Sequence, residues 1–161
     1  MPVSIPSPID WTPDHRIRIL DQTRLPEEEV YRDLRDVEDV AEAIRSLRVR
    51  GAPLIGIAAA MGVAMVAGPR GSGAAGEDGL GRIREACRVL GATRPTAVNL
   101  HWALKRMERR AEAAAGAGEP LEAALNGEAN AIWDEDRAMC RRIGDLGAEL
   151  IPDGGTIATI C

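Results

Sequence analysis

The first strongly patterned stretch of the chain, residues 15–20, alternates polar and apolar residues. That alternation is the period of a β-strand with one buried face. Residues 21–26 then supply turn-forming side chains, and residues 30–35 are the candidate partner strand. The pattern therefore predicts a small antiparallel β-sheet near the amino-terminal end.

Beyond residue 35, apolar positions recur every three or four residues, the period of a helix that packs on a core. Asp36 is well placed as an N-cap, with Asp39 at the third helical position, and this first helix is expected to end near Arg48. The chain is therefore expected to be mainly α-helical. Further helices are predicted over residues 54–67, 80–90 and 97–115, and from Pro120 to a turn at residues 152–155.

The segment 54–67 is apolar on every side, which indicates a helix inside the bundle. Pro53 suits its first position, because a proline lacks the amide hydrogen that would be unbonded there. We expect the amino-terminal end of this helix to be buried as well. The run is too short to cross a bilayer and contains Gly56 and Gly62, so no membrane span is predicted.

The last residues, 156–161, are β-branched or small and mostly apolar, which is typical of a central strand in a parallel sheet. Such a strand needs neighbours that this chain does not supply. We therefore expect a helical domain with a small sheet over residues 1–152, followed at residues 153–161 by the start of a second domain. The carboxy-terminal part of the same protein is then an expected partner.

The formal net charge is -5, and the basic side chains form no broad cationic stretch. Nucleic acid is therefore not an expected partner, since binding it needs clustered cations. The three cysteines form no Cys-x-x-Cys pair and no histidine stands at ligand spacing, which argues against a disulfide framework or a zinc site. Residues 1–10 lack the basic start and apolar stretch of a signal peptide, so a cytoplasmic protein is expected.

The segment Arg50-Gly51-Ala52-Pro53 places a cation and a residue without a side chain directly before the apolar helix. Unbonded amides and the positive end of the helix dipole attract phosphate, and Arg50 can add a bidentate contact. Arg94 also precedes a proline at a predicted helix start, so a second guanidinium can converge on the same ligand. The alternative is that Arg50 is an ordinary helix-end charge, Gly51 a plain C-cap and Arg94 a surface charge.

Two segments of this sequence are similar to signature segments of the methylthioribose-phosphate isomerases: residues 49–60 (VRGAPLIGIAAA) and residues 94–100 (RPTAVNL). Residues 20–26 (LDQTRLP) resemble a third. The similarity runs in order over essentially the whole chain. The same family includes ribose-1,5-bisphosphate isomerases and the alpha, beta and delta regulatory subunits of the translation initiation factor 2B exchange complex.

The resemblance implies a helical amino-terminal domain with a small antiparallel sheet, then a Rossmann-like α/β domain of which this chain holds only the first strand, and assembly as a homodimer. It implies that Arg50, Gly51, Ala52 and Arg94 bind a small-molecule sugar-phosphate substrate. It further implies that Cys161, at the end of that strand, is catalytic, together with an aspartate farther along the full-length chain. No metal and no organic cofactor is expected.

The implied reaction converts 5-methylthioribose 1-phosphate into 5-methylthioribulose 1-phosphate in methionine salvage, an aldose-ketose isomerisation. The phosphate on the anomeric oxygen blocks simple hemiacetal opening, so acid/base catalysis has to open the ring. Cys161 and the downstream aspartate are the expected proton-transfer groups, and this fragment alone is expected to be inactive. Ile160 departs from the family pattern, which commonly has a histidine there, so the Cys161 thiolate should be harder to form.

Three other functions stay open. A ribose-1,5-bisphosphate isomerase would hold a second phosphate in place of the methylthio group. A regulatory subunit would bind a sugar phosphate or a nucleotide without converting it, and an isolated helical interaction module would bind no phosphate.

The remaining cysteines and two of the tryptophans have simpler expected roles. Cys87 and Cys140 are expected to be packing residues of helices. Trp102 and Trp133 are expected to be core or interface anchors, because large rings on helices usually bury area.

Overall fold

The computed structural model describes residues 6–68 and 77–158. Its small sheet has three antiparallel strands in the order β1 (Ile9–Trp11), β2 (Ile17–Leu20) and β3 (Tyr31–Leu34). Ile9 pairs with Ile19. The alternation predicted for β2 is confirmed: Ile17 and Ile19 are fully buried, while Arg18 faces outward and binds Asp33 on β3 at 2.6 Å.

The first helix, α1 (Val37–Arg45), begins as predicted, because the Asp36 carboxylate accepts a hydrogen bond from the backbone amide of Asp39. It ends about one turn earlier than the expected Arg48. Leu47 adopts a positive φ of 60°, and the amide of Val49 then bonds back to the carbonyl of Ala43 at 3.1 Å. This left-handed residue ends the helix and turns the chain toward the next one.

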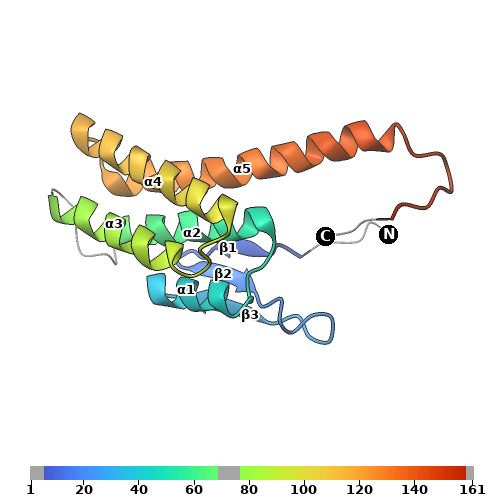
Figure 1. Cartoon of the computed structure of the whole chain (residues 1–161), viewed down its shortest axis with the longest axis horizontal. Coiled ribbons are helices and arrows are strands. Elements are labelled where there is room, and N and C mark those ends of the chain that lie inside the picture. The colour runs from blue at the N-terminus through green and yellow to red at the C-terminus, as the bar shows by residue number, and fades with distance from the viewer. Residues whose placement is uncertain (1–5, 69–76, 159–161) are drawn as a thin grey trace.

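The helix α2 (Ala52–Ala67) is the centre of the bundle, as its all-apolar sequence predicts. It contacts α1, strand β2, and the helices α3 (Glu77–Gly91), α4 (Val98–Ala117) and α5 (Leu121–Ala148). In Figure 1, α2 lies between α1 with the sheet on one side and α4 with α5 on the other. The fold is therefore mainly helical with a small antiparallel sheet, as expected. In the part of the chain that the structure describes, no helix combines the length and apolarity needed to span a membrane.

Two expectations about helix starts are wrong. Gly51, Ala52 and Pro53 are exposed, so the amino-terminal end of α2 is not buried: only from Ile55 onward does the helix enter the core. Pro95 does not begin a helix either. It lies in a turn, and α4 starts three residues later at Val98, because the amide of Ala97 bonds to the carbonyl of Arg94 and closes that turn first.

The last helix, α5, packs on the bundle only through its first half. Ile132 is its last buried residue, and Met139, Ile143 and Leu146 beyond it are exposed. In Figure 1, the second half of α5 extends past the other helices.

The turn predicted at residues 152–155 is present, but residues 156–158 form no strand. A strand needs a neighbouring strand to bond with, and no described strand lies beside these residues. The expected Rossmann-like strand is therefore not confirmed in its described part, and the domain boundary at residue 152 stays a prediction.

Candidate functional site

The amino-terminal end of α2 has the local geometry of an anion site. Gly51 is its N-cap, with φ 114°, a backbone conformation that favours glycine, and it offers no side chain to cap the helix. The first intrahelical bond runs from the amide of Ile55 to the carbonyl of Gly51 at 3.1 Å. The amides of Ala52 and Leu54 precede that bond and have no intrahelical acceptor. No acidic residue lies in the first turn to neutralise the dipole.

The two arginines singled out in the sequence, Arg50 and Arg94, are both available to a ligand. Within the described residues, neither guanidinium makes a hydrogen bond or an ion pair. Arg48, two residues before Arg50, is by contrast engaged with Asp21 at 2.7 Å. A guanidinium without a protein partner at a surface is free to bind a carboxylate or phosphate in a bidentate way.

The contact between α2 and α4 brings the two segments to one end of the bundle. A Cβ atom at Gly56 would lie 2.7 Å from the carbonyl oxygen of Asn99, so only glycine allows the first turns of these helices to approach so closely. Both helices begin at the same end of the molecule (Figure 1). The segment with Arg50, Gly51 and Ala52 and the turn with Arg94 therefore lie toward the same end of the bundle. The start of α4 at Val98 agrees within one residue with the predicted start at residue 97.

A cavity of about 380 Å³ adjoins this end. Its wall is mostly apolar and comes from the first turns of α2 and α4 and the middle of α5. Glu135 and Asp136 add carboxylates, and Arg106 binds Glu135 at 2.8 Å and lies over the ring of Trp102. Its lining residues are Pro53, Gly56, Ile57, Val98, Asn99, Trp102, Ile132, Glu135, Asp136 and Met139.

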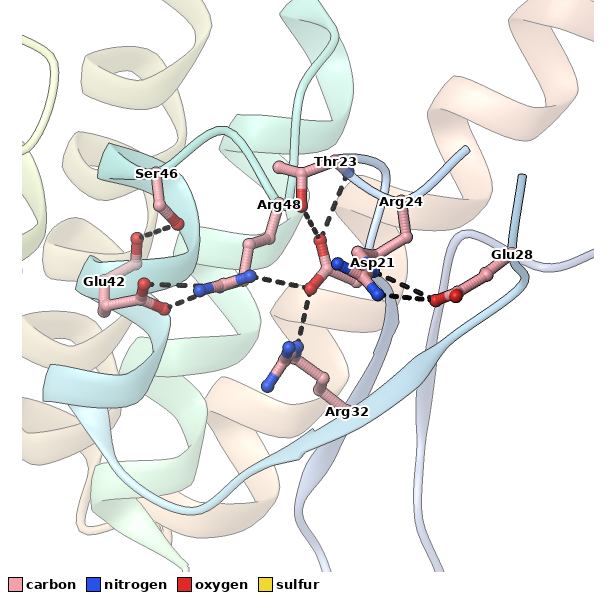
Figure 2. A network of polar contacts seen from close by, with 8 residues as sticks. All are labelled: Asp21, Thr23, Arg24, Glu28, Arg32, Glu42, Ser46 and Arg48. Atoms are coloured by element: carbon pink, nitrogen blue, oxygen red, sulfur yellow. Dashed lines mark hydrogen bonds and ion pairs between the residues drawn. The ribbon is translucent and has the colours of Figure 1, made fainter. Parts of the chain in front are cut away.

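A network of polar contacts is centred on Asp21 and includes Arg48, two residues before Arg50 (Figure 2). The Asp21 side chain is fully buried and accepts hydrogen bonds from Thr23 Oγ1 at 2.6 Å, Arg32 Nε at 2.6 Å and Arg48 Nη1 at 2.7 Å. Burial by itself would raise the pKa of Asp21, but these three side-chain donors and the Thr23 amide outweigh it and hold that pKa well below its usual range. Asp21 is therefore a buried carboxylate that stays ionised.

The sequence analysis assigned no role to Asp21, Arg48 or Asn99. The available signal was indirect: Asp21 and Asn99 lie within the segments that resemble the isomerase family. Nothing in the local pattern shows that Asp21 pairs with a residue 27 positions away. Such a pair becomes visible only once the chain is folded.

The cysteines divide into three cases. The catalytic candidate, Cys161, lies outside the described residues, so its role stays a prediction. Cys87 is buried in α3, as expected. Cys140 is exposed, so the expectation that it packs is wrong, because α5 has already left the bundle at that point.

The tryptophans also differ from one another. Trp133 packs partly buried against the core, whereas Trp102 is 47% exposed at the rim of the cavity. Among the described residues, no three side chains of the types that bind metals lie together.

Comparison with known proteins gives consistent matches. A model of the Initiation factor 2 subunit family matches residues 48–161. The chain is 48% identical over 155 residues to methylthioribose-1-phosphate isomerase of Geobacter metallireducens, which covers 95% of this chain and 44% of that protein. It is 51% identical over 148 residues to the protein of the same name from Desulforudis audaxviator, covering 92% and 42%. The chain therefore spans less than half the length of these relatives.

Two solved structures share the fold. One is 5-methylthioribose 1-phosphate isomerase from Pyrococcus horikoshii, with a TM-score of 0.81 and 37% identity over 92% of this chain and 41% of that one. The other is translation initiation factor eIF-2B, subunit delta, from A. fulgidus, with a TM-score of 0.80 and 34% identity over 89% and 41%.

Proposed function

Because the chain belongs to the Initiation factor 2 subunit family, we propose that it is the substrate-clamping part of a 5-methylthioribose-1-phosphate isomerase. Two relatives about 50% identical to it carry that activity in their names. The full-length protein would convert 5-methylthioribose 1-phosphate into 5-methylthioribulose 1-phosphate.

The proposal rests on two guanidiniums that have no partner among the described residues and on a helix end without a side-chain cap. Arg50 precedes the open amides of α2, and the close contact of Gly56 with Asn99 brings the Arg94 turn to the same end. A charged hydrogen bond contributes about 1.5–3 kcal/mol and a helix dipole on the order of 1 kcal/mol. The arginines would therefore supply most of the affinity for the phosphate, and the amides of α2 its orientation.

The neighbouring cavity favours an apolar group at the other end of the sugar. Its wall is mostly apolar, and its charged lining residues, Glu135 and Asp136, are acidic. A second phosphate would meet carboxylates there, whereas a methylthio group would bury apolar area. This supports methylthioribose 1-phosphate over ribose 1,5-bisphosphate as the substrate.

The chemistry itself is assigned to Cys161 and to an aspartate of the full-length protein. One group would donate a proton toward the ring oxygen, which breaks the bond from that oxygen to the first carbon. The other would take up the proton of the 2-hydroxyl group as hydrogen moves from the second carbon to the first, so that the second carbon becomes the ketone and the protons balance. Three apolar residues in the second half of α5 are exposed: Met139, Ile143 and Leu146. They would pack against the remaining part of the full-length protein. The full-length protein would also assemble as a homodimer.

The direct test is an isomerase assay of the full-length protein with methylthioribose 1-phosphate and ribose 1,5-bisphosphate side by side. We expect turnover of the first and little of the second. Cys161→Ser should bind the sugar phosphate but lose turnover. Full activity of that variant would remove the cysteine from the mechanism.

A regulatory role is the second candidate, since the eIF-2B subunit delta from A. fulgidus matches this chain with a TM-score of 0.80, compared with 0.81 for the isomerase from Pyrococcus horikoshii. That role predicts binding of a sugar phosphate or nucleotide without product. Saturation by a specific ligand would stabilise the protein by roughly 3 kcal/mol in either case, so only product formation distinguishes the two. Tight binding without turnover would favour the regulatory role.

A further inference from the structure

Asp21 is a buried charge that the proposed function does not use directly. Its side chain has no exposed surface, and it lies in the loop directly after β2. A charge is expensive to bury and persists only where partners compensate for it. Asp21 accepts four hydrogen bonds, from the hydroxyl and the amide of Thr23 and from the guanidiniums of Arg32 and Arg48. The two guanidiniums also compensate its charge.

One of these donors leads directly to the candidate site. Arg48 binds Asp21 at 2.7 Å with Nη1, while its Nε binds Glu42 at 3.1 Å (Figure 2). Its backbone is held as well, because the amide of Gln22, the neighbour of Asp21, donates to the carbonyl of Arg48 at 3.0 Å. Side chain and main chain of Arg48 are therefore both fixed to the Asp21 loop.

The residue between Arg48 and Arg50 is also held in place. Val49 is fully buried, and its amide bonds to the carbonyl of Ala43. Arg50 comes next: it is exposed, and its guanidinium has no partner in the described part of the chain. Gly51 is then the N-cap of α2. Hydrogen bonds and burial therefore fix the chain up to Val49, the residue before Arg50.

Arg48 and Arg50 have different roles because their contacts differ. Arg48 is only 25% exposed, and its Nη1 and Nε atoms already bind the carboxylates of Asp21 and Glu42, so its charge is paired within the protein. Without Asp21, the Arg48 guanidinium and the loop would lose their common anchor, and the position of Arg50 and Gly51 would become less defined. A binding group has to be held within about 0.5 Å of its productive position, which requires this kind of supporting contact.

We propose that Asp21 is a positioning residue that acts through Arg48 to hold Arg50 and Gly51 in place for the phosphate of the substrate. This inference rests on the proposed function, and it adds a residue that does not touch the substrate.

The test uses Asp21→Asn and Arg48→Gln in the full-length protein, with methylthioribose 1-phosphate as the probe. Both variants should raise KM about tenfold, while kcat stays within about threefold, because the loss concerns binding that is equal in the ground state and the transition state. Arg48→Gln keeps the proposal testable if Asp21→Asn does not fold. Folded variants with an unchanged KM would overturn the proposal.

Two controls separate positioning from general destabilisation. Glu28→Gln breaks the exposed Arg24–Glu28 ion pair in the same loop and should leave KM unchanged. Ile83→Ala removes a fully packed side chain of α3 and should lower the melting temperature without raising KM, when assayed well below that temperature. If Ile83→Ala raises KM as much as Asp21→Asn, the effect is one of stability and the proposal fails.

A double-mutant cycle with Arg50→Gln gives the sharpest readout. If Asp21 acts through Arg50, then Asp21→Asn should raise KM less than about threefold in the Arg50→Gln background, compared with about tenfold in the wild type. Fully additive effects would contradict the proposal. Failure of the proposed function would look different: the wild-type protein itself would neither bind nor convert the sugar phosphate.

Discussion

Gly56 and Asn99 lie so close together that a methyl group does not fit between them: a Cβ atom on Gly56 would stand 2.7 Å from the Asn99 carbonyl oxygen and 3.4 Å from the Cβ of Ala103. The obstacle is backbone, which cannot rotate away as a side chain can. This contact sets the separation of α2 and α4 at their starts, and with it the arrangement of the two candidate phosphate-binding segments.

Gly56→Ala should therefore force the two helices apart. We expect a loss of about 1–3 kcal/mol in the free energy of unfolding, as for other overpacked interiors, and weaker binding of methylthioribose 1-phosphate. Urea denaturation and a binding titration measure the two effects. Gly127→Ala is the matched control, since nothing lies within 4 Å of its added Cβ in α5, and it should stabilise by about 0.5–1 kcal/mol. Equal stability of both variants would contradict the close contact.

The buried carboxylate of Asp21 should make stability depend on pH in acid. The pKa of Asp21 is lowered in the folded protein, so the unfolded chain binds more protons once pH falls below about 4. The stabilisation by the ionised carboxylate is therefore complete above that value and is lost as pH falls further toward the folded-state pKa.

The comparison with Asp21→Asn measures this directly. The difference in free energy of unfolding between wild type and variant should be constant from pH 7 to about pH 5 and shrink below about pH 4. Asp134→Asn, at an exposed carboxylate of α5, should change stability by less than about 0.5 kcal/mol. A difference between wild type and Asp21→Asn that grows in acid would have the wrong sign for this account.

Cys87 and Cys140 should differ sharply in reactivity. Burial, reinforced by the nearby Glu108 carboxylate, raises the pKa of Cys87 to about 12, whereas Cys140 is exposed on α5. A maleimide reagent at pH 8 should therefore label Cys140 and spare Cys87 until the protein is unfolded. Site-resolved mass spectrometry gives the extent at each cysteine, and rapid labelling of native Cys87 would show that α3 opens easily.

Local patterns in the sequence predicted those parts of the fold that local interactions determine. The Asp36 cap depends only on the neighbouring amide of Asp39, and the alternation of Ile17 and Ile19 depends only on which face of a strand is buried. The strand β1 was missed because three residues are too few to show a period. Cys140 was misplaced because a helical pattern does not tell where a helix leaves the bundle.

The sequence predicted which residues belong to the candidate site, but it did not predict how they are arranged in space. Arg50 and Gly51 stand out because a cation and a glycine precede a buried helix, which is a local feature. The placement of this segment and the Arg94 turn toward one end of the bundle depends on the tertiary contact of Gly56 with Asn99. Arg94 does not directly precede a helix as expected, because Pro95 lies in a turn and α4 begins at Val98. The Asp21–Arg48 pair is likewise a product of folding.

The central claim is that Arg50 and Arg94 bind one phosphate group, and a titration of methylthioribose 1-phosphate into the full-length protein tests it most directly. Arg50→Gln and Arg94→Gln should each weaken binding by about 10- to 100-fold, the value of a charged hydrogen bond. Arg45→Gln, at an exposed arginine near the end of α1, should change it less than about twofold. If both variants bind the sugar phosphate as tightly as the wild type does, these arginines do not hold the phosphate and the account is wrong.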